Sequence, residues 1–176
     1  MTRWEQLAKQ ENFSAAGFVP TADICFNSDF RRYCAENLCG QYGQNYSCPP
    51  DCGTPEEMRR RVLAYKYALV LQSKWDICDY SDTAAIKKAK KAHNEATLRI
   101  AEKLSDAQMV GASCCSLCAH CVLPAGKPCV FPQKRFSCLS AYCIHAQKLA
   151  ERCGMEYTCA DGKLALFSIL LTNETL

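Results

Sequence analysis

Closely spaced cysteines are the residues of this chain whose type and spacing best suit chemistry. The chain has 15 cysteines among 176 residues, an odd number that cannot pair completely into disulfides within one chain. Eight of them fall into two stretches, and thiolates that are close in sequence can converge on one metal centre. The sequence therefore predicts two metal centres.

The first group of cysteines reads Cys34-x4-Cys39-x8-Cys48-x3-Cys52. Glycines beside these cysteines allow the backbone to turn tightly, and the N–H groups of such a loop can donate to cluster sulfurs. The spacing favours an iron–sulfur cluster. A structural zinc ion held by the same four thiolates is the alternative.

The second group reads Cys115-x2-Cys118-x2-Cys121, followed after seven residues by Cys129. Bacterial ferredoxins bind a [4Fe-4S] cluster with the same C-x2-C-x2-C run and a more distant fourth cysteine near a proline. Cys129 is the first candidate for the fourth ligand, with Cys114 as its rival. Structural zinc sites usually pair two short knuckles instead, so this group favours a cubane more strongly than the first.

The cysteines outside the two groups have simpler explanations. We expect Cys25 to be a core residue, and Cys143 and Cys153 to be small apolar residues on a buried helix face. Cys138 is expected at the start of that helix, where it could be a reserve ligand or a reactive thiol. His120, between two cysteines of the second group, is expected to be an exposed loop residue rather than a ligand.

Alternating helices and strands must position these cysteines. In the first half, apolar periodicity and turn residues predict a helix over 3–16, a strand over 24–26, and a helix from Thr54 to about 63. A buried strand over 67–71 follows. Thr54, Pro55 and the two glutamates after them form a typical helix start.

The second half predicts a helix over 83–104, a strand over 107–112, a helix over 138–153 and a strand over 164–171. His93 falls on the apolar side of the first of these helices and is expected to be a structural histidine. The alternation predicts an α/β (α+β) sandwich with a small sheet. We expect a single domain over 1–176, with cluster loops at about 34–53 and 114–132.

The charge balance excludes some classes of function. The chain has 21 Lys and Arg against 18 Asp and Glu, a net charge of +3, which is too small to indicate a nucleic-acid or membrane partner. The first residues lack the apolar core of a secretory signal. We therefore expect a cytoplasmic protein with reduced thiols.

The two motifs, in this order, resemble a family of uncharacterised proteins described as predicted metal-binding proteins, found largely in anaerobic archaea and bacteria. The resemblance spans roughly residues 15–155. It implies that all eight cysteines of the two groups are metal ligands, and it fits the iron–sulfur proteins of anaerobes. The matching residues are Cys34, Cys39-Gly-Gln-Tyr-Gly43, Cys48-Pro-Pro50, Gly53-Thr-Pro-Glu-Glu57, Tyr65-Lys-Tyr-Ala-Leu69, Cys115-Ser-Leu-Cys118-Ala-His-Cys121, Pro128-Cys-Val-Phe-Pro132 and Arg135-Phe-Ser137.

Eight thiolates suffice for two [4Fe-4S] clusters, and a cluster with all irons ligated by protein transfers electrons rather than binding a substrate. We therefore expect an electron carrier that works with a redox partner protein. Lysines at 87–91 form a positive patch that could dock it. One alternative is an enzyme whose cluster keeps one iron open as a Lewis acid or reductant. Another is a zinc-binding structural or interaction module.

Overall fold

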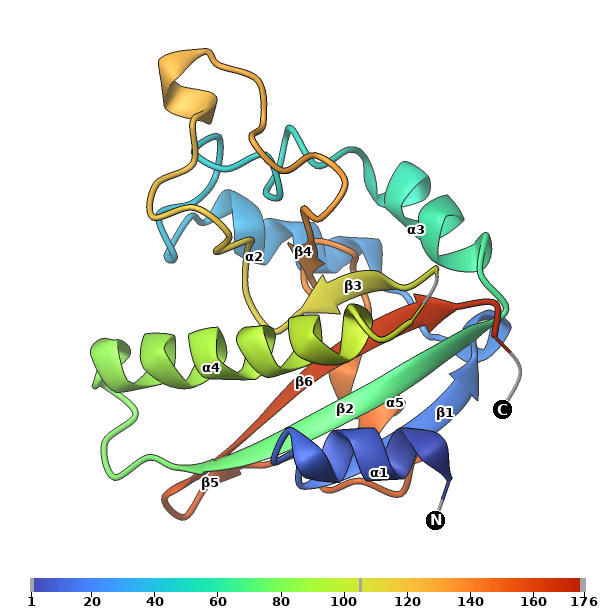
Figure 1. Ribbon diagram of the computed structural model, residues 1–176. Helices are drawn as coiled ribbons and strands as arrows, with labels where there is room; N and C mark the ends of the chain where they lie inside the picture. Colours follow the sequence, from blue (N-terminus) through green and yellow to red (C-terminus); the bar gives the residue numbers. More distant parts are fainter. Residues whose placement is uncertain (1, 105, 175–176) are drawn as a thin grey trace.

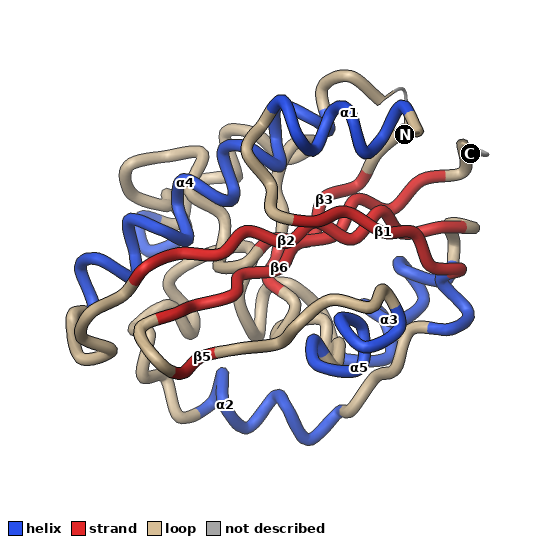
Figure 2. The backbone as a smooth tube through the Cα atoms, turned by 90° about the horizontal axis from the view of Figure 1, so that it is seen from below, coloured by secondary structure: helices blue, strands red, loops and turns tan. Residues whose placement is uncertain are grey.

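A mixed sheet with helices on both faces forms the centre of the molecule (Figures 1 and 2). The computed structural model describes residues 2–104 and 106–174. The strands are β1 (Ala15–Pro20), β2 (Tyr67–Asp76), β3 (Gln108–Gly111), β4 (Ser137–Cys138), β5 (Cys159–Ala160) and β6 (Lys163–Thr172). The helices are α1 (Arg3–Gln10), α2 (Arg31–Ala35), α3 (Pro55–Leu63), α4 (Thr83–Ala101) and α5 (Ala146–Arg152).

The strand order is β1-β2-β6-β3-β4, and β5 also pairs with β6. Strands β2 and β6 are antiparallel and pair along their whole length, from Tyr67 opposite Thr172 to Asp76 opposite Lys163. Only β3 and β4 are parallel, with Gly111 opposite Cys138. The described strands and helices confirm the α+β class.

Each face of the sheet has its own apolar core, because alternate residues of a strand point to opposite faces. Leu69 and Leu71 pack with residues of α1 and α4, including Trp4 and Ile100. Their neighbours on β2, including Val70, pack on the other face with residues of α3 and α5. Figure 2 shows α1 and α4 on one side of the sheet and α3 and α5 on the other. Both faces of β2 and β6 are therefore covered.

The capping residues of α3 agree with the prediction. The Thr54 side chain accepts the N–H of Glu57 at 3.2 Å, and the Glu57 carboxylate accepts the N–H of Thr54 at 2.8 Å. Pro55 occupies the first turn, where its missing N–H costs nothing. This reciprocal cap fixes where the first cysteine loop ends and α3 begins.

Two predicted elements were wrong in the first segment of the chain. Helix α1 ends at Gln10 rather than residue 16, because the chain turns at Asn12, which has a positive φ of 61°. The strand lies at Ala15–Pro20 and not at 24–26. In the predicted strand only Phe26 pairs, in an isolated bridge with Ile144. Sheet pairing with β2 is decided by tertiary contacts that local periodicity does not show.

The helix predicted over 138–153 was too long. Cys138 belongs to β4, and the chain then turns twice before α5 begins at Ala146. Tyr142 donates its N–H to the Cys138 carbonyl, and Cys143 has a positive φ of 58°. The apolar residues of this segment fill the core from a turn rather than from a helix.

Loops 34–53 and 114–132 meet beyond one end of β3, where Figure 1 shows them near α2. Three hydrogen bonds join the loops. Asn45 donates to the Cys115 carbonyl at 3.1 Å, Cys115 donates its N–H to the Ser47 hydroxyl at 2.9 Å, and Tyr46 donates to the Lys127 carbonyl at 2.9 Å. No described helix combines the length and apolar character that crossing a membrane requires.

Candidate metal centres

The four cysteines of the second group surround one small cavity, as their spacing predicts. Cys115, Cys118, Cys121 and Cys129 all line it. The other lining residues are Asn45, Tyr46, Leu117, Phe131 and Arg135, none of which is acidic. We call this arrangement the second thiol cavity. A site that has a positive side chain and no carboxylate is an environment in which several thiolates can be held together.

Backbone hydrogen bonds position Cys115 in this cavity. Burial raises the pKa of its thiol, and the nearby backbone N–H groups of Leu117 and Phe136 oppose that shift. Such N–H donors to sulfur orient a thiolate ligand and tune the potential of the metal it binds. The ring of Phe136 is buried against Gly111, where any larger residue would collide with it at 2.9 Å. The sheet thus supports this loop directly.

The first group behaves differently. Three of its cysteines, Cys34, Cys39 and Cys48, line a cavity of about 250 Å³. Two cysteines from elsewhere in the chain, Cys114 and Cys138, line the same cavity. We call it the first thiol cavity. The side chain of Lys90, from α4, also lines it.

Cys52, the fourth member of the first group, does not line that cavity. It is 2% exposed and packs in the core that α3 and α5 share with the sheet. Its sulfur lies 3.6 Å from the Arg31 guanidinium, which also donates to the Gly53 carbonyl at 2.7 Å. Burial raises the pKa of the Cys52 thiol, although the charge of Arg31 opposes that shift.

An interaction between the thiols of Cys48 and Cys114 links the first group to the second loop. It is the main reason that the pKa of Cys48 is raised and that the pKa of Cys114 is lowered to about 7. The Ser47 hydroxyl lies 3.8 Å from the Cys48 sulfur and also accepts the N–H of Cys115. Cys48 is therefore in contact with the segment that begins the second group.

Cys138 is the fifth thiol of the first cavity, and the spacing of the first group gave no sign of it. Burial raises its pKa to about 12, and its sulfur accepts the N–H of Ala141 at 3.4 Å. The parallel pairing of β4 with β3 places it there. The sequence predicted Cys138 as a reserve ligand or reactive thiol, but from a helix start that the structure does not have at this residue.

Histidines do not take part in either cavity. His93 is buried between the hydroxyls of Ser73 and Ser168, at 2.6 and 2.9 Å. This confirms its predicted structural role. His120 lies exposed in the second loop, as predicted, and does not line the second thiol cavity.

The donor set fits a sulfur-ligated metal, because thiolates are the ligands of zinc and of iron–sulfur clusters. In the described residues, no three Cys, His, Asp or Glu side chains lie close enough to hold one metal ion as they stand. A cubane takes its thiolates at four separate corners, so its ligands surround a larger volume than those of a single ion. The five thiols of the first thiol cavity, which is about 250 Å³, suit that wider arrangement, whereas the four thiols of the second line a cavity of only about 20 Å³.

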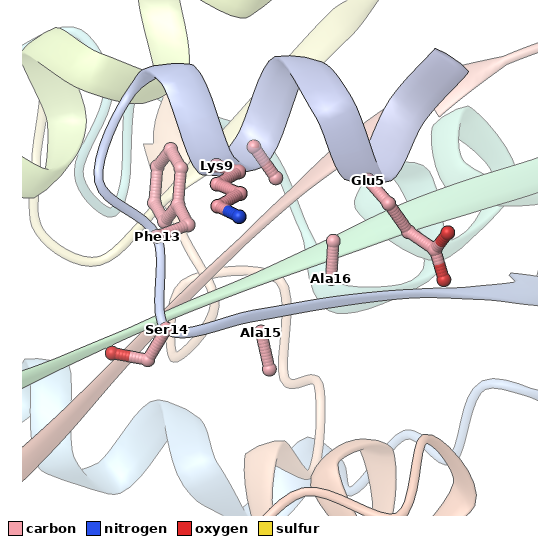
Figure 3. Close-up of a pocket in the computed structure, with 7 residues that line it drawn as sticks. Glu5, Lys9, Phe13, Ser14, Ala15 and Ala16 are labelled. Atoms are coloured by element: carbon pink, nitrogen blue, oxygen red, sulfur yellow. The ribbon is translucent and has the colours of Figure 1, made fainter. Parts of the chain in front are cut away.

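The described residues also line cavities other than the two thiol cavities. One of about 470 Å³ is lined by Cys52, Arg61, Tyr142 and Arg135, among others. Another, of about 570 Å³, lies between α1 and β1 and is lined by Glu5, Lys9, Phe13 and small residues (Figure 3). It contains no cysteine or histidine and thus no soft metal ligand.

Comparison with known proteins gives one match. Residues 17–172 match the model of a family described as predicted metal-binding protein (DUF2284). The matched range contains all the cysteines of both groups. No curated protein and no solved structure matches the chain.

Proposed function

The chain belongs to this family of predicted metal-binding proteins, and from that premise we propose that it binds two [4Fe-4S] clusters and transfers electrons to or from a redox partner protein. The carrying observation is the second thiol cavity, which is lined by four cysteines with ferredoxin-like spacing. The first thiol cavity supplies the second set of ligands.

The ligands of the second centre in this proposal are Cys115, Cys118, Cys121 and Cys129. Those of the first centre are Cys34, Cys39 and Cys48, with Cys52 as the fourth ligand predicted by spacing. A cluster bound at either place would supply one-electron transfer. The protein's part is to hold the thiolates, donate N–H groups to them and set the local charge.

The surroundings of both cavities support electron transfer. Arg135 lines the second cavity and Lys90 the first, and a nearby positive charge favours the more negative, reduced state of a cluster. Lys87, Lys88 and Lys91 are exposed on α4 beside Lys90. An acidic redox partner could therefore approach the first centre with favourable electrostatics.

Metal and sulfide analysis of protein purified without oxygen tests the proposal. We expect about eight iron and about eight sulfide per chain, a brown colour, and an electron paramagnetic resonance signal after reduction. Cys118→Ser should lose about half of the iron and sulfide. Cys159→Ser is the matched control, because Cys159 is exposed on β5 and lines neither cavity. Stoichiometric zinc without sulfide would contradict the iron–sulfur assignment.

A second candidate is an enzyme whose second cluster has one open iron beside a substrate pocket. The observation that favours it is the cavity of about 470 Å³, which shares Tyr46 and Arg135 with the second thiol cavity and adds Arg61. Two guanidinium groups suit an anionic small molecule. Adding citrate to the reduced protein should change the electron paramagnetic resonance spectrum of the second cluster if this candidate is correct. The spectrum should stay unchanged if that cluster has four protein ligands.

A further inference from the structure

We propose that Cys114, rather than Cys52, is the fourth thiolate of the first centre, so that the neighbouring residues Cys114 and Cys115 bind different centres. This inference rests on the proposed function, since it concerns the ligands of a centre proposed there. It changes the first centre from a site made by one loop to a site made by both.

The first argument is the position of the thiols. Cys114 lines the same cavity as Cys34, Cys39 and Cys48, whereas Cys52 does not. The thiols of Cys48 and Cys114 also interact with each other, and this interaction is the first cause of the pKa shift of each. Cys114 is therefore the additional thiol in direct contact with a member of the first group.

The second argument is the environment of Cys52. Cys52 packs in the core beneath α3, at the wall of the cavity of about 470 Å³, and its sulfur lies against Arg31. The same guanidinium is anchored to the Ala141 carbonyl at 2.9 Å and to the Gly53 carbonyl at 2.7 Å. Turning Cys52 toward the first cavity would require rearranging this packed segment, which a well-packed core resists.

Cys138 is the remaining thiol of the cavity, and its contacts assign it a different role. It lies in β4, where the sheet fixes its backbone, and its sulfur accepts the Ala141 N–H. Burial is the main cause of its raised pKa and the nearby Cys34 thiol adds to it, whereas the mutual interaction of Cys114 and Cys48 is the first cause of both their pKa shifts. We assign Cys138 to the wall of the first centre, where a partly buried thiol acts as a small apolar side chain.

The placement of Cys114 and Cys115 brings the two centres close together. Successive Cα atoms are only about 3.8 Å apart, yet these two residues line different cavities. The Ser47 hydroxyl makes a second connection, because it accepts the Cys115 N–H and contacts the Cys48 sulfur. One peptide unit and one hydroxyl thus join ligands of the two centres, a short route for an electron.

Single serine variants test the assignment in protein purified without oxygen. Iron and sulfide per chain should fall by about half in Cys114→Ser and remain at the wild-type value in Cys52→Ser and Cys138→Ser. A loss of half in Cys52→Ser or Cys138→Ser, with full content in Cys114→Ser, would overturn this inference and leave the proposed function standing. Wild-type protein without bound metal would overturn both.

A second measurement covers the case in which Cys114→Ser does not fold. Native wild-type protein is treated with iodoacetamide before and after removal of its metal, and the modified cysteines are mapped by mass spectrometry. Cys114 is half-exposed and should react only after metal removal. Cys52 is buried and should stay unmodified in both samples. Equal modification of Cys114 before and after metal removal would contradict its role as a ligand.

Discussion

The sheet and the two cysteine loops are stabilised by different interactions. Strands β2 and β6 bury apolar residues on both faces, and every buried side-chain nitrogen or oxygen among the described residues has a hydrogen-bond partner. The loops over 34–53 and 114–132 have little regular structure and expose large apolar side chains, including Leu38 at 90% and Val130 at 56%. Apolar burial holds the sheet together, whereas the loops have mainly thiols and a few hydrogen bonds.

This difference indicates that the two regions depend differently on metal. A packed sheet retains its structure without ligands, while a loop that gathers thiolates gains most of its order when a metal binds. Three matched pairs of substitutions compare the packed sheet and its helices with the cysteine loops and the residues next to them.

The largest effect is expected from a pair of phenylalanines. Phe136 is 1% exposed in the core shared by the sheet with α1 and α4, whereas Phe131 is 44% exposed in the second loop. Phe136→Ala should lower the free energy of unfolding by about 3–5 kcal/mol because it leaves a cavity. Phe131→Ala should change it by less than about 1 kcal/mol. Urea denaturation followed by circular dichroism measures both, and equal losses would show that packing stabilises the loop as well.

A pair of histidines gives the next effect, which depends on pH. Burial lowers the pKa of His93 to about 3, whereas an unfolded histidine titrates near 6.5. Between these values the unfolded chain binds a proton that the folded chain does not. The stability that neutral His93 contributes is therefore complete above about pH 6.5. It falls by about 1.4 kcal/mol for each pH unit below that value, down to about pH 3.

The measurement is the free energy of unfolding between pH 6.5 and 4.5. The wild-type slope should be steeper than that of His93→Asn by about 1.4 kcal/mol per pH unit. His120→Gln, in the exposed part of the second loop, is the control and should keep the wild-type slope. If His93→Asn keeps the wild-type slope, the imidazole of His93 in the wild-type protein must take up a proton in the folded state as readily as in the unfolded chain.

The smallest effect concerns two helix caps. Thr2 caps α1, which packs on the sheet, and Thr54 caps α3, which follows the first loop; both form the same reciprocal pair with a glutamate. Replacing either with alanine should cost about 1 kcal/mol. Thermal unfolding of the two variants tests this equality. A much larger loss in Thr54→Ala would show that the first loop contributes to global stability.

The sequence predicted the parts of the fold that local physics determines. Apolar runs gave β2 and β6, and the cap at Thr54 gave α3. The cysteines that line the second thiol cavity could be grouped from the sequence because they lie within one short loop. The first was predicted only in part, because Cys114 and Cys138 reach it through the pairing of β3 with β4 and through the contact of the two loops. Spacing along the chain carries no information about such tertiary contacts.

The pairing of β2 with β6 has a consequence for the order of events during folding. Tyr67 lies opposite Thr172, so this central pair forms only after both cysteine loops have been synthesised. Contacts between residues so far apart in sequence form slowly, because closing a long loop costs entropy before the contact is gained. Until β6 docks, the loops have no complete sheet to support them. We therefore expect the sheet to be the slow step in biogenesis and metal insertion to follow it, so that a nascent chain carries its thiols unligated until synthesis has passed β6.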